Sequence, residues 1–328
     1  MLRTPLTDLL NIGVPIIQAP IGSATCPELA AAVSNADGLG MLALSWKEVE
    51  SARVAIRETR ALTNKPFAVN LVLEWDQTER LEVCLQENVP IISFSWGDAS
   101  PYIPLVKEAG SKTMVTVASA ADAERMATMG VDVIVAQGWE AGGHVLGQVT
   151  TMALVPRVVD AVDPIPVVAA GGVADGRGVA AALALGAAGV WVGTRFLASE
   201  ESRAHARYRE SLLVAAETDT AYTTAFNGGW GAPHRVIRNS TLEHWWRAGS
   251  PAVGKRPGEG EVVARYEDGD PVQLYDDAIP CSGMKGEMER LALYAGQSVG
   301  LVDTIKPAAT IMHEMVEEAA RVIRGLPR

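Results

Sequence analysis

Short apolar runs rich in valine and isoleucine alternate with helical segments from residue 15 to residue 195. The runs contain few polar residues, which indicates strands that are buried on both faces. Such strands, when helices separate them, form a parallel sheet covered by those helices. Eight units favour a closed (β/α)8 barrel, the TIM-barrel form of the α/β class, over an open doubly wound sheet. The eight predicted strands are Pro15–Ala19, Gly40–Leu44, Phe67–Leu71, Ile91–Phe94, Thr113–Val117, Val133–Ala136, Val167–Ala170 and Gly189–Val192.

Helix start and stop signals lie between these runs. Ser, Thr and Asp side chains cap helix N-termini, proline suits the first turn, and glycine commonly ends a helix. We therefore expect helices between the strands to begin near these start signals and to end near these glycines: Thr25 with Pro27, Asp76, Ser119 and Asp175 as starts, and Gly38, Gly130 and Gly186 as stops.

The alternation breaks after Phe196. Residues from about 205 to 285 are rich in Trp, Gly, Pro and charged side chains, which is typical of long loops. We predict a barrel formed by residues 1–205 and 285–328, with residues 206–284 as a smaller inserted lid domain. Two further helices, Met284–Ala295 and Ala308–Arg324, are expected to close the barrel wall.

Composition excludes several classes of protein. The formal charge is −11, from 28 basic and 39 acidic residues, which argues against a nucleic-acid partner. No run of eighteen apolar residues predicts a membrane span, and the first fifteen residues contain no long apolar signal sequence. The three cysteines, Cys26, Cys84 and Cys281, lie too far apart to suggest a metal site or a disulfide framework. This usage favours a reduced, cytoplasmic setting.

The active site of a barrel lies at the C-terminal ends of its strands. The sixth predicted strand opens at Gln137 into a glycine-rich loop that contains His144. The positions that follow the strands are small and polar, with a single histidine and no cluster of acids, which suggests that a cofactor supplies the chemistry. These positions include Pro20–Gly22, Ser45–Trp46, Asn70, Ser93–Gly97, Thr116, Gln137–His144, Gly171–Gly172 and Gly193–Thr194.

Two of these segments, in the loops after the last two strands, predict a phosphate site. Loops after the seventh and eighth strands of such barrels often bind phosphate through backbone N–H groups. Gly171–Gly172 and Gly193–Thr194 occupy these loops. Glycine lets the backbone approach a ligand closely, and the threonine adds a hydroxyl. Each pair alone also fits a tight turn, but two pairs in the two expected loops favour phosphate binding.

Three side chains at the predicted mouth have competing interpretations. Asn70 and Gln137 either hydrogen-bond a flavin edge or satisfy backbone groups in a turn. His144 has only Glu140 near it as a second ligand, so no metal site is predicted. A histidine on a glycine loop at a barrel mouth suits a general base or a hydrogen-bond donor to substrate, and we predict this role over a structural one.

Two motifs suggest other functions. Gly296–Gly300 matches the G-x-S-x-G turn of serine hydrolases around Ser298, but the preceding residues read as helix instead of the required strand. Asp303 and His313 also follow too closely for the triad order of such enzymes. Gly38–Gly40 resembles part of a dinucleotide fingerprint but precedes a strand instead of following one.

Five segments together resemble the nitronate monooxygenase family, formerly called 2-nitropropane dioxygenases. They are PIIQAPIG (15–22), KPFAVNL (65–71), QGWEAGGH (137–144), PVVAAGGVADGRGVAAALALGAAGVWVGTRF (166–196) and AGQSVGL (295–301). The resemblance covers most of residues 10–205, returns at residues 290–325, and implies an FMN-dependent TIM barrel with a lid and His144 as the catalytic residue. The strand ends and the resemblance together assign FMN to Ala19, Pro20, Ile21, Gly22, Asn70, Thr116, Gln137, Gly142, Gly143, Gly171, Gly172, Trp191, Val192, Gly193 and Thr194. Trp191–Val192 stands where the family has Gln followed by Leu or Met, so contacts there are expected through backbone atoms.

The resemblance implies oxidation of alkyl nitronates, such as propionate 3-nitronate, by O2, with release of nitrite and a carbonyl product. A sister group, the flavin-type enoyl-acyl-carrier-protein reductases, shares the histidine loop, so NAD(P)H-dependent reduction of an enoyl thioester is the alternative. The predicted partners are a small-molecule substrate and O2, and the oligomeric state stays open, with a homodimer as one option. Four tryptophans either line the substrate space or pack between barrel and lid: Trp46, Trp96, Trp139 and Trp230.

Overall fold

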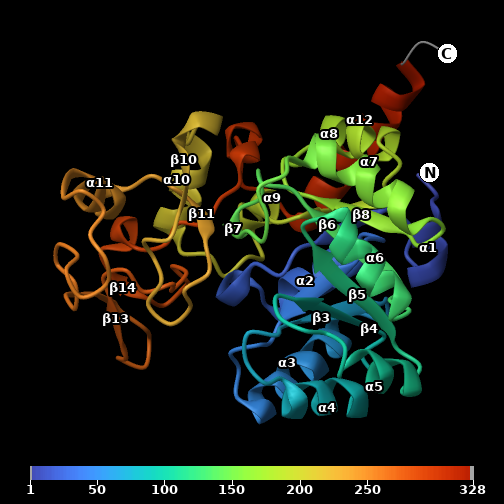
Figure 1. The fold of residues 1–328 in the computed structure, drawn as a ribbon, viewed down its shortest axis with the longest axis horizontal. Coiled ribbons are helices and arrows are strands. Elements are labelled where there is room, and N and C mark those ends of the chain that lie inside the picture. The colour runs from blue at the N-terminus through green and yellow to red at the C-terminus, as the bar shows by residue number, and fades with distance from the viewer. Residues whose placement is uncertain (1, 326–328) are drawn as a thin grey trace.

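Eight parallel strands form a barrel at the centre of the computed structural model, which describes residues 2–325 (Figure 1). The strands neighbour one another in the order β1-β9-β8-β6-β5-β4-β3-β2. A parallel bridge between Ile17 and Leu39 brings the two edges together. The barrel strands are β1 (Ile16–Gln18), β2 (Gly40–Ala43), β3 (Phe67–Val72), β4 (Ile91–Ser95), β5 (Lys112–Val117), β6 (Val133–Gln137), β8 (Val167–Ala170) and β9 (Gly189–Val192).

The predicted TIM barrel and all eight of its strands are confirmed, with ends that differ by one residue at most. Helices connect the strands and cover the outside of the barrel (Figure 1). The last three residues of the predicted second barrel segment, 326–328, lie outside the described range. The helices of the barrel part are α1 (Pro5–Leu10), α2 (Pro27–Asn35), α3 (Val49–Leu62), α4 (Thr78–Gln86), α5 (Ile103–Glu108), α6 (Ala120–Thr128), α7 (Thr151–Val162), α8 (Gly176–Ala184), α9 (Thr194–Leu197) and α12 (Ala308–Gly325).

The residues predicted to start helices differ in whether their side chains cap the helix N-terminus. Ser119 and Asp175 are the N-caps of α6 and α8, and their side chains accept hydrogen bonds from backbone N–H groups in the first turn. At α4, Asp76 lies one residue before the N-cap and accepts from the N–H of Thr78 at 3.0 Å. At α2 the N-cap is Cys26 instead of Thr25, without a side-chain bond.

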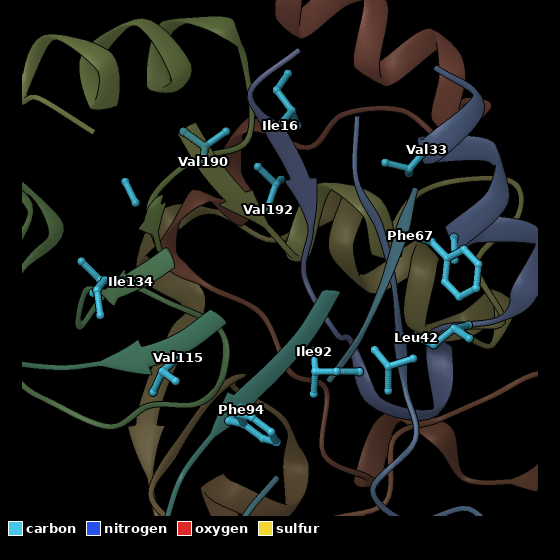
Figure 2. Close-up of a cluster of buried hydrophobic side chains, with 14 of the residues drawn as sticks. Ile16, Val33, Leu42, Phe67, Ile92, Phe94, Val115, Ile134, Val190 and Val192 are labelled. Carbon is cyan, nitrogen blue, oxygen red and sulfur yellow. The ribbon is translucent and has the colours of Figure 1, made fainter. Parts of the chain in front are cut away.

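Alternate residues of each strand enter two separate cores. One core lies between the strands and the helices, as Figure 2 shows for Ile16, Val190 and Val192. The other fills the barrel interior and contains Ile17 and Trp191 from the same two strands. The two-residue period of a strand produces this division, and each fully buried valine or isoleucine contributes roughly 1.5–3 kcal/mol.

The predicted lid segment, residues 206–284, projects to one side of the barrel in Figure 1, coloured yellow to orange. The division from the barrel at its two ends stays a prediction. Two small antiparallel sheets lie in this region, in the orders β10-β11-β7 and β13-β12-β14. The elements of this region, with β7 from the barrel part and β14 just after residue 284, are β7 (Gly143–His144), α10 (Ala206–Val214), β10 (Thr220–Thr223), β11 (His234–Ile237), α11 (Ser240–Arg247), β12 (Val262–Arg265), β13 (Pro271–Gln273) and β14 (Lys285–Gly286).

One of the two late helices was predicted wrongly. Residues 284–295 contain β14, a short 3-10 turn at Met288–Arg290 and an extended stretch instead of a helix. The N–H of Ile237 donates to Leu293 O at 2.8 Å and the N–H of Ala295 donates to Arg235 O at 3.3 Å, so the stretch pairs with β11. Residues 291–295 are all buried, so both faces of this extended stretch are covered, which explains its apolar side chains.

The other late helix is confirmed as α12, which packs against α8 and α2 and completes the wall. Its Glu318 carboxylate accepts from the N–H of Gly176 at the start of α8 at 2.8 Å. Within residues 2–325, no helix combines the length and the apolarity that a bilayer crossing needs.

Candidate active site

A cavity of about 350 Å³ opens at the C-terminal ends of the barrel strands and reaches under the lid segment. The C-terminal ends of all eight barrel strands, or the loops that follow them, line it, together with parts of residues 208–298. The structure brings together every predicted site residue except Val192: Ala19, Pro20, Ile21, Gly22, Asn70, Thr116, Gln137, Gly142, Gly143, His144, Gly171, Gly172, Trp191, Gly193 and Thr194.

Val192 lies in the outer core, because it follows Trp191 on β9 and alternate residues face opposite sides. Its carbonyl accepts a hydrogen bond from the N–H of Ala19 at 2.9 Å, so the backbone of Val192 supports the first strand loop instead of facing the cavity. A ligand in the cavity would meet the Trp191 side chain at this strand and then the backbone of Gly193.

The glycine turns after β8 and β9 present unused donors to the cavity. Gly171 and Gly172 have φ values of 100° and 75°, a region that glycine enters without strain. A Cβ at Gly171 would lie 3.0 Å from the Ala141 nitrogen. Within residues 2–325, the N–H groups of Gly172, Gly193 and Thr194 donate to no protein acceptor. These donors suit an anionic oxygen-rich group such as a phosphate.

Two buried polar atoms deeper in the cavity, which have no hydrogen-bond partner within residues 2–325, also suit a bound cofactor. Thr116 Oγ1 and Trp191 Nε1 are buried and have no hydrogen-bond partner in the described chain. Buried polar groups without partners are rare in folded proteins, so these two atoms are suited to hydrogen-bond a ligand in the cavity. The carbonyl oxygens and ring nitrogens of a flavin are partners of the required kind. The residues present therefore fit the flavin that the sequence resemblance implies.

His144 is held where the barrel and the lid segment meet. As part of β7, it pairs with His234 of β11. Its ring lies 3.8 Å from the Trp230 ring, centroid to centroid, and its Nε2 is buried without a partner in the described chain. Burial lowers the pKa of His144 to about 3, and the nearby His234 adds to this effect. The imidazole is therefore neutral at physiological pH and carries one free lone pair and one N–H.

His234 differs from its neighbour because both of its ring nitrogens are used. Nδ1 lies 3.0 Å from Ala232 O, and Nε2 accepts from the N–H of Phe226 at 3.3 Å. These contacts place the proton on Nδ1. Burial lowers the pKa of His234 to about 4. This histidine has a structural role, as its complete burial also indicates.

The two amides at the mouth are already hydrogen-bonded within the protein. Gln137 donates through Nε2 to His144 O at 3.1 Å and accepts from the N–H of Leu146 at 2.9 Å, so it fixes the histidine loop. Asn70 donates to Ser93 Oγ at 3.1 Å. The turn interpretation therefore describes the side chain of Gln137, and Asn70 is oriented from the neighbouring strand.

Further hydrogen bonds connect the histidine loop to the glycine turns. Glu140 accepts from the N–H of Thr151 at 2.9 Å, and Thr151 Oγ1 donates to Gly171 O at 3.1 Å. Thr194 Oγ1 accepts from the N–H of Gly296 at 3.0 Å, which leaves its hydroxyl proton available. The same short chain of contacts thus holds the predicted catalytic and phosphate-binding loops in one arrangement.

Four indoles form a continuous cluster from the surface to His144. The rings of Trp46 and Trp75 are 6.0 Å apart, Trp75 and Trp230 are 5.5 Å apart, and Trp230 and Trp96 are 4.9 Å apart. Trp46 is 50% exposed, so the cluster reaches solvent. Sequence reasoning did not select Trp75, although it closely follows β3 as Trp46 follows β2.

Trp139, in contrast, packs away from the cavity. The Arg235 guanidinium lies 4.6 Å from its ring centroid, and Nη2 of Arg235 donates to Trp139 O at 2.8 Å. The packing interpretation therefore describes Trp139, whereas Trp46, Trp96 and Trp230 line the cavity.

Sequence reasoning also missed the cavity residues that follow β13, among them Asp277 and Tyr294. The Tyr294 hydroxyl donates to the Asp277 carbonyl at 3.2 Å. Burial raises the pKa of the Asp277 carboxyl to about 6, and Asp276 adds to this shift. Asp277 lies in a stretch without a strand or helix period, and Tyr294 lies in the run that was wrongly predicted as a helix, so the sequence did not indicate either position.

Ser298 lines the cavity, but no hydrolase triad surrounds it. The residues before it are extended instead of helical, which corrects the reason given above for rejecting the motif. His313 pairs with Glu317 on α12 at 3.1 Å, and Asp303 accepts from Thr304 Oγ1 at 2.9 Å. Among the described residues there is also no group of three His, Cys, Asp or Glu side chains suited to a metal.

Comparisons with known proteins agree with this geometry. A sequence model of the family described as nitronate monooxygenase matches residues 3–79 and 73–318. A probable nitronate monooxygenase of Staphylococcus aureus (strain JH9) is 31% identical over 98% of this chain and 99% of its own length. A protein of Mycobacterium tuberculosis is 40% identical over 77% of this chain and 71% of its own length. That protein is named (3aS,4S,5R,7aS)-5-hydroxy-7a-methyl-1-oxo-octahydro-1H-indene-4-carboxyl-CoA dehydrogenase.

Two solved structures resemble the whole chain. FabK from Thermotoga maritima superposes with a TM-score of 0.83 and 38% identity, over 98% of this chain and 97% of its own. Nitroalkane oxidase from Streptomyces ansochromogenes superposes with a TM-score of 0.79 and 28% identity, over 98% of this chain and 99% of its own.

Proposed function

The chain belongs to the nitronate monooxygenase family, and from that premise we propose that it uses FMN to oxidise alkyl nitronates with O2, releasing nitrite and a carbonyl product. The family and the relatives make the protein a flavoprotein oxidoreductase. The substrate, the identity of the flavin as FMN and the assignment of site residues are part of the proposal.

The observation that carries the proposal is the state of His144 at the cavity. The ring lines the cavity, is neutral at physiological pH, and has a nitrogen without a partner in the described chain. A neutral imidazole can donate a hydrogen bond to a nitro oxygen, and it can accept a proton from the adjacent carbon when a neutral nitroalkane binds. The amide of Gln137 holds the carbonyl of His144 and so keeps the ring at the cavity edge.

The remaining residues would hold and cover the cofactor. The free N–H groups of Gly172, Gly193 and Thr194 would bind the FMN phosphate. Thr116 and Trp191 would supply donors to the polar edge of the ring system. FMN, when bound, supplies the electron acceptor and the reaction with O2. The indole cluster, including Trp230, excludes water from the space next to His144.

Aerobic nitrite release from propionate 3-nitronate tests the substrate. The FMN-loaded protein should release nitrite at a rate that depends on His144, and His144→Ala should keep its flavin but lose most of this rate. His313→Ala is the control, because that histidine lies exposed on α12. No nitrite from a protein with FMN fully bound would remove the nitronate assignment and leave the flavoprotein assignment intact.

A second candidate, reduction of an enoyl thioester with NAD(P)H, is favoured by the lining of the cavity. The lining includes four tryptophans and no Lys or Arg, so it suits an uncharged, apolar acyl group. FabK is an enoyl-acyl-carrier-protein reductase, and the M. tuberculosis relative is named for a CoA thioester. Rapid anaerobic bleaching of the flavin by NADH, followed by reoxidation with a trans-2-enoyl thioester, would favour this function over nitronate oxidation.

A further inference from the structure

Arg235 is a buried cation of the lid segment whose side chain reaches a loop of the barrel. It lies on β11, is 2% exposed, and donates through Nε and Nη2 to the carbonyl oxygen of Trp139 at 3.3 and 2.8 Å. Within residues 2–325 the guanidinium hydrogen-bonds no other acceptor. Its central carbon also lies 4.6 Å from the centroid of the Trp139 ring and 5.9 Å from that of Tyr222 on β10. Both contacts to Trp139 fall on the loop that carries His144, residues 138–144.

The positive charge of Arg235 strengthens its contact with this loop. Burial lowers the pKa of Arg235, and the nearby Glu140 carboxylate counteracts this shift. An arginine side chain stays charged throughout the ordinary pH range. The Glu140 carboxylate itself accepts from the N–H of Thr151 at 2.9 Å, so it leaves the guanidinium to the Trp139 carbonyl. Hydrogen bonds from a charged donor are roughly twice as strong as those between neutral groups, so this carbonyl is firmly held.

Few other contacts tie the loop to the lid segment. Strand β7 has two residues, Gly143 and His144, and pairs with only two residues of β11. Among the described residues, Arg235 supplies the only side-chain hydrogen bonds from the lid segment to the backbone of residues 138–144. On the barrel side, Gln137 holds the carbonyl of His144 at 3.1 Å. Arg235 therefore completes, from the lid segment, the support that the barrel gives to this loop.

Strand β11 itself does not depend on the Arg235 side chain. It pairs with β10 over four residues, Thr220–Thr223 against His234–Ile237. The N–H of Ile237 also donates to Leu293 O at 2.8 Å, outside that ladder. Loss of the guanidinium should therefore loosen the loop of residues 138–144 and leave β11 in place.

We propose that Arg235 is a positioning residue: from the lid segment it fixes the loop that carries His144, and so keeps the imidazole where a substrate reacts. This inference rests on the proposed function, because it requires His144 to take part in the reaction. Arg235 lies outside the cavity lining, so it acts through His144 and not by contact with the substrate. A displacement of about 1 Å in a reacting group is enough to lower a rate by about a hundredfold.

A double-mutant cycle with His144 tests this route. In the FMN-loaded protein, Arg235→Met removes the donors and keeps an unbranched side chain, so kcat for nitrite release from propionate 3-nitronate should fall about ten- to a hundredfold. In a His144→Ala background the same substitution should have no further effect, because the group on which it acts is gone. Arg235→Lys keeps a charged donor and should lose less than Arg235→Met. Arg238→Met is the control and should keep the wild-type kcat, since Arg238 is exposed and pairs with Asp219.

A second readout needs no turnover. Amide hydrogen exchange, followed by mass spectrometry of the protein as purified, compares peptides from residues 138–144 with peptides from β10 and β11. Arg235→Met should speed exchange in residues 138–144 by roughly tenfold or more, the effect of losing a hydrogen bond from a charged group. Exchange in the β10–β11 ladder and the flavin content should stay at their wild-type levels. A global loss of stability would instead speed exchange in both regions.

The outcomes separate this inference from the proposed function. If the wild type releases no nitrite but exchange rises only in residues 138–144 of Arg235→Met, the nitronate assignment fails and the hold of Arg235 on the loop stands. The inference is wrong if exchange rises equally in the β10–β11 ladder, or if Arg235→Lys loses as much as Arg235→Met. It is also wrong if Arg235→Met lowers kcat by the same factor with and without His144.

Discussion

The barrel and the lid segment line one cavity with different kinds of groups. The barrel contributes backbone N–H groups on glycine turns and small side chains such as Thr116 and Asn70. The lid segment contributes Trp230 and Asp277, and its strand β11 pairs with the loop that carries His144. In the proposed function, the barrel would hold the cofactor, and the lid segment would surround the place where a substrate meets His144.

His144 and His234 show the same contrast within one pair of strands. They are partners in the β7–β11 ladder, and their rings lie 5.5 Å apart. Both nitrogens of His234 are hydrogen-bonded, whereas Nε2 of His144 has no partner in the described chain. A buried imidazole with unused capacity is suited to a ligand, and one with full hydrogen bonding is suited to structure.

The largest expected effect comes from removing His144. We expect His144→Ala to lower kcat by about 10²–10⁴-fold, the usual contribution of a general acid–base group, while flavin content and melting temperature stay close to those of the wild type. Stopped assays of nitrite, or of NAD(P)H consumption for the second candidate, measure this rate. A variant that keeps its activity would show that the unpartnered nitrogen serves no chemistry.

The opposite pattern is expected for His234. Replacement by alanine leaves the Phe226 N–H and the Ala232 carbonyl without partners, so we expect a loss of about 2–4 kcal/mol in the free energy of unfolding. Residual folded protein should keep most of its kcat. Denaturant titration measures the loss, and His244→Ala on α11 is the control for an exposed histidine.

Both histidines should also make stability depend on pH. Their folded pKa values, about 3 and about 4, lie below the ordinary value of 6.5, so the unfolded chain binds more protons in this range. Stability is therefore fully present above about pH 6.5 and is lost as pH falls toward 4. Thermal unfolding between pH 7.5 and 4.5 measures the slope, which should be smaller in His234→Gln than in the wild type.

A smaller effect is expected at the glycine turn after β8. Gly171→Ala requires a φ of 100° from a residue with a side chain and brings its Cβ within 3.0 Å of the Ala141 nitrogen. Strain of about 1–3 kcal/mol should weaken flavin binding by roughly ten- to a hundredfold. Gly110→Ala is the control. Gly110 also has a positive φ, 78°, but has open space around it, so this substitution should leave the dissociation constant of the flavin unchanged.

The smallest effect is expected at the entrance of the cavity. Trp75 is 36% exposed and contacts Trp46 and Trp230, so Trp75→Ala should raise KM by roughly two- to tenfold and leave kcat within twofold. Leu105→Ala, which removes another exposed apolar side chain from α5, is the control. If kcat instead falls by as much as KM was expected to rise, Trp75 acts by positioning His144 and not by shaping the entrance.

The contrast between the two regions also explains how much the sequence could predict. Strands such as β8 and β9 are short apolar runs of fixed period between capped helices, so their ends, and with them Gly171 and Gly193, could be located from residue order alone. The positions of Asp277 and Tyr294 depend on pairing of their segments with distant residues such as Gly228 and Arg235, which local patterns do not show. The wrong helix at 284–295 has this same cause, because tertiary pairing with β11 overrides its local helix preference.

Val192 shows a limit of a different kind. The family resemblance covered a continuous run of residues, whereas a strand presents only alternate side chains to one face. Trp191 therefore lines the cavity and Val192 packs in the outer core. The two-residue period, applied to the run, would have separated them.

The absorption spectrum of the purified protein, before and after incubation with FMN and gel filtration, tests the central claim most directly. The account predicts a yellow protein with a flavin spectrum and about one FMN per chain, and a clear loss of FMN in Gly171→Ala but not in Gly110→Ala. A folded wild-type protein that stays colourless after incubation with excess FMN would contradict it.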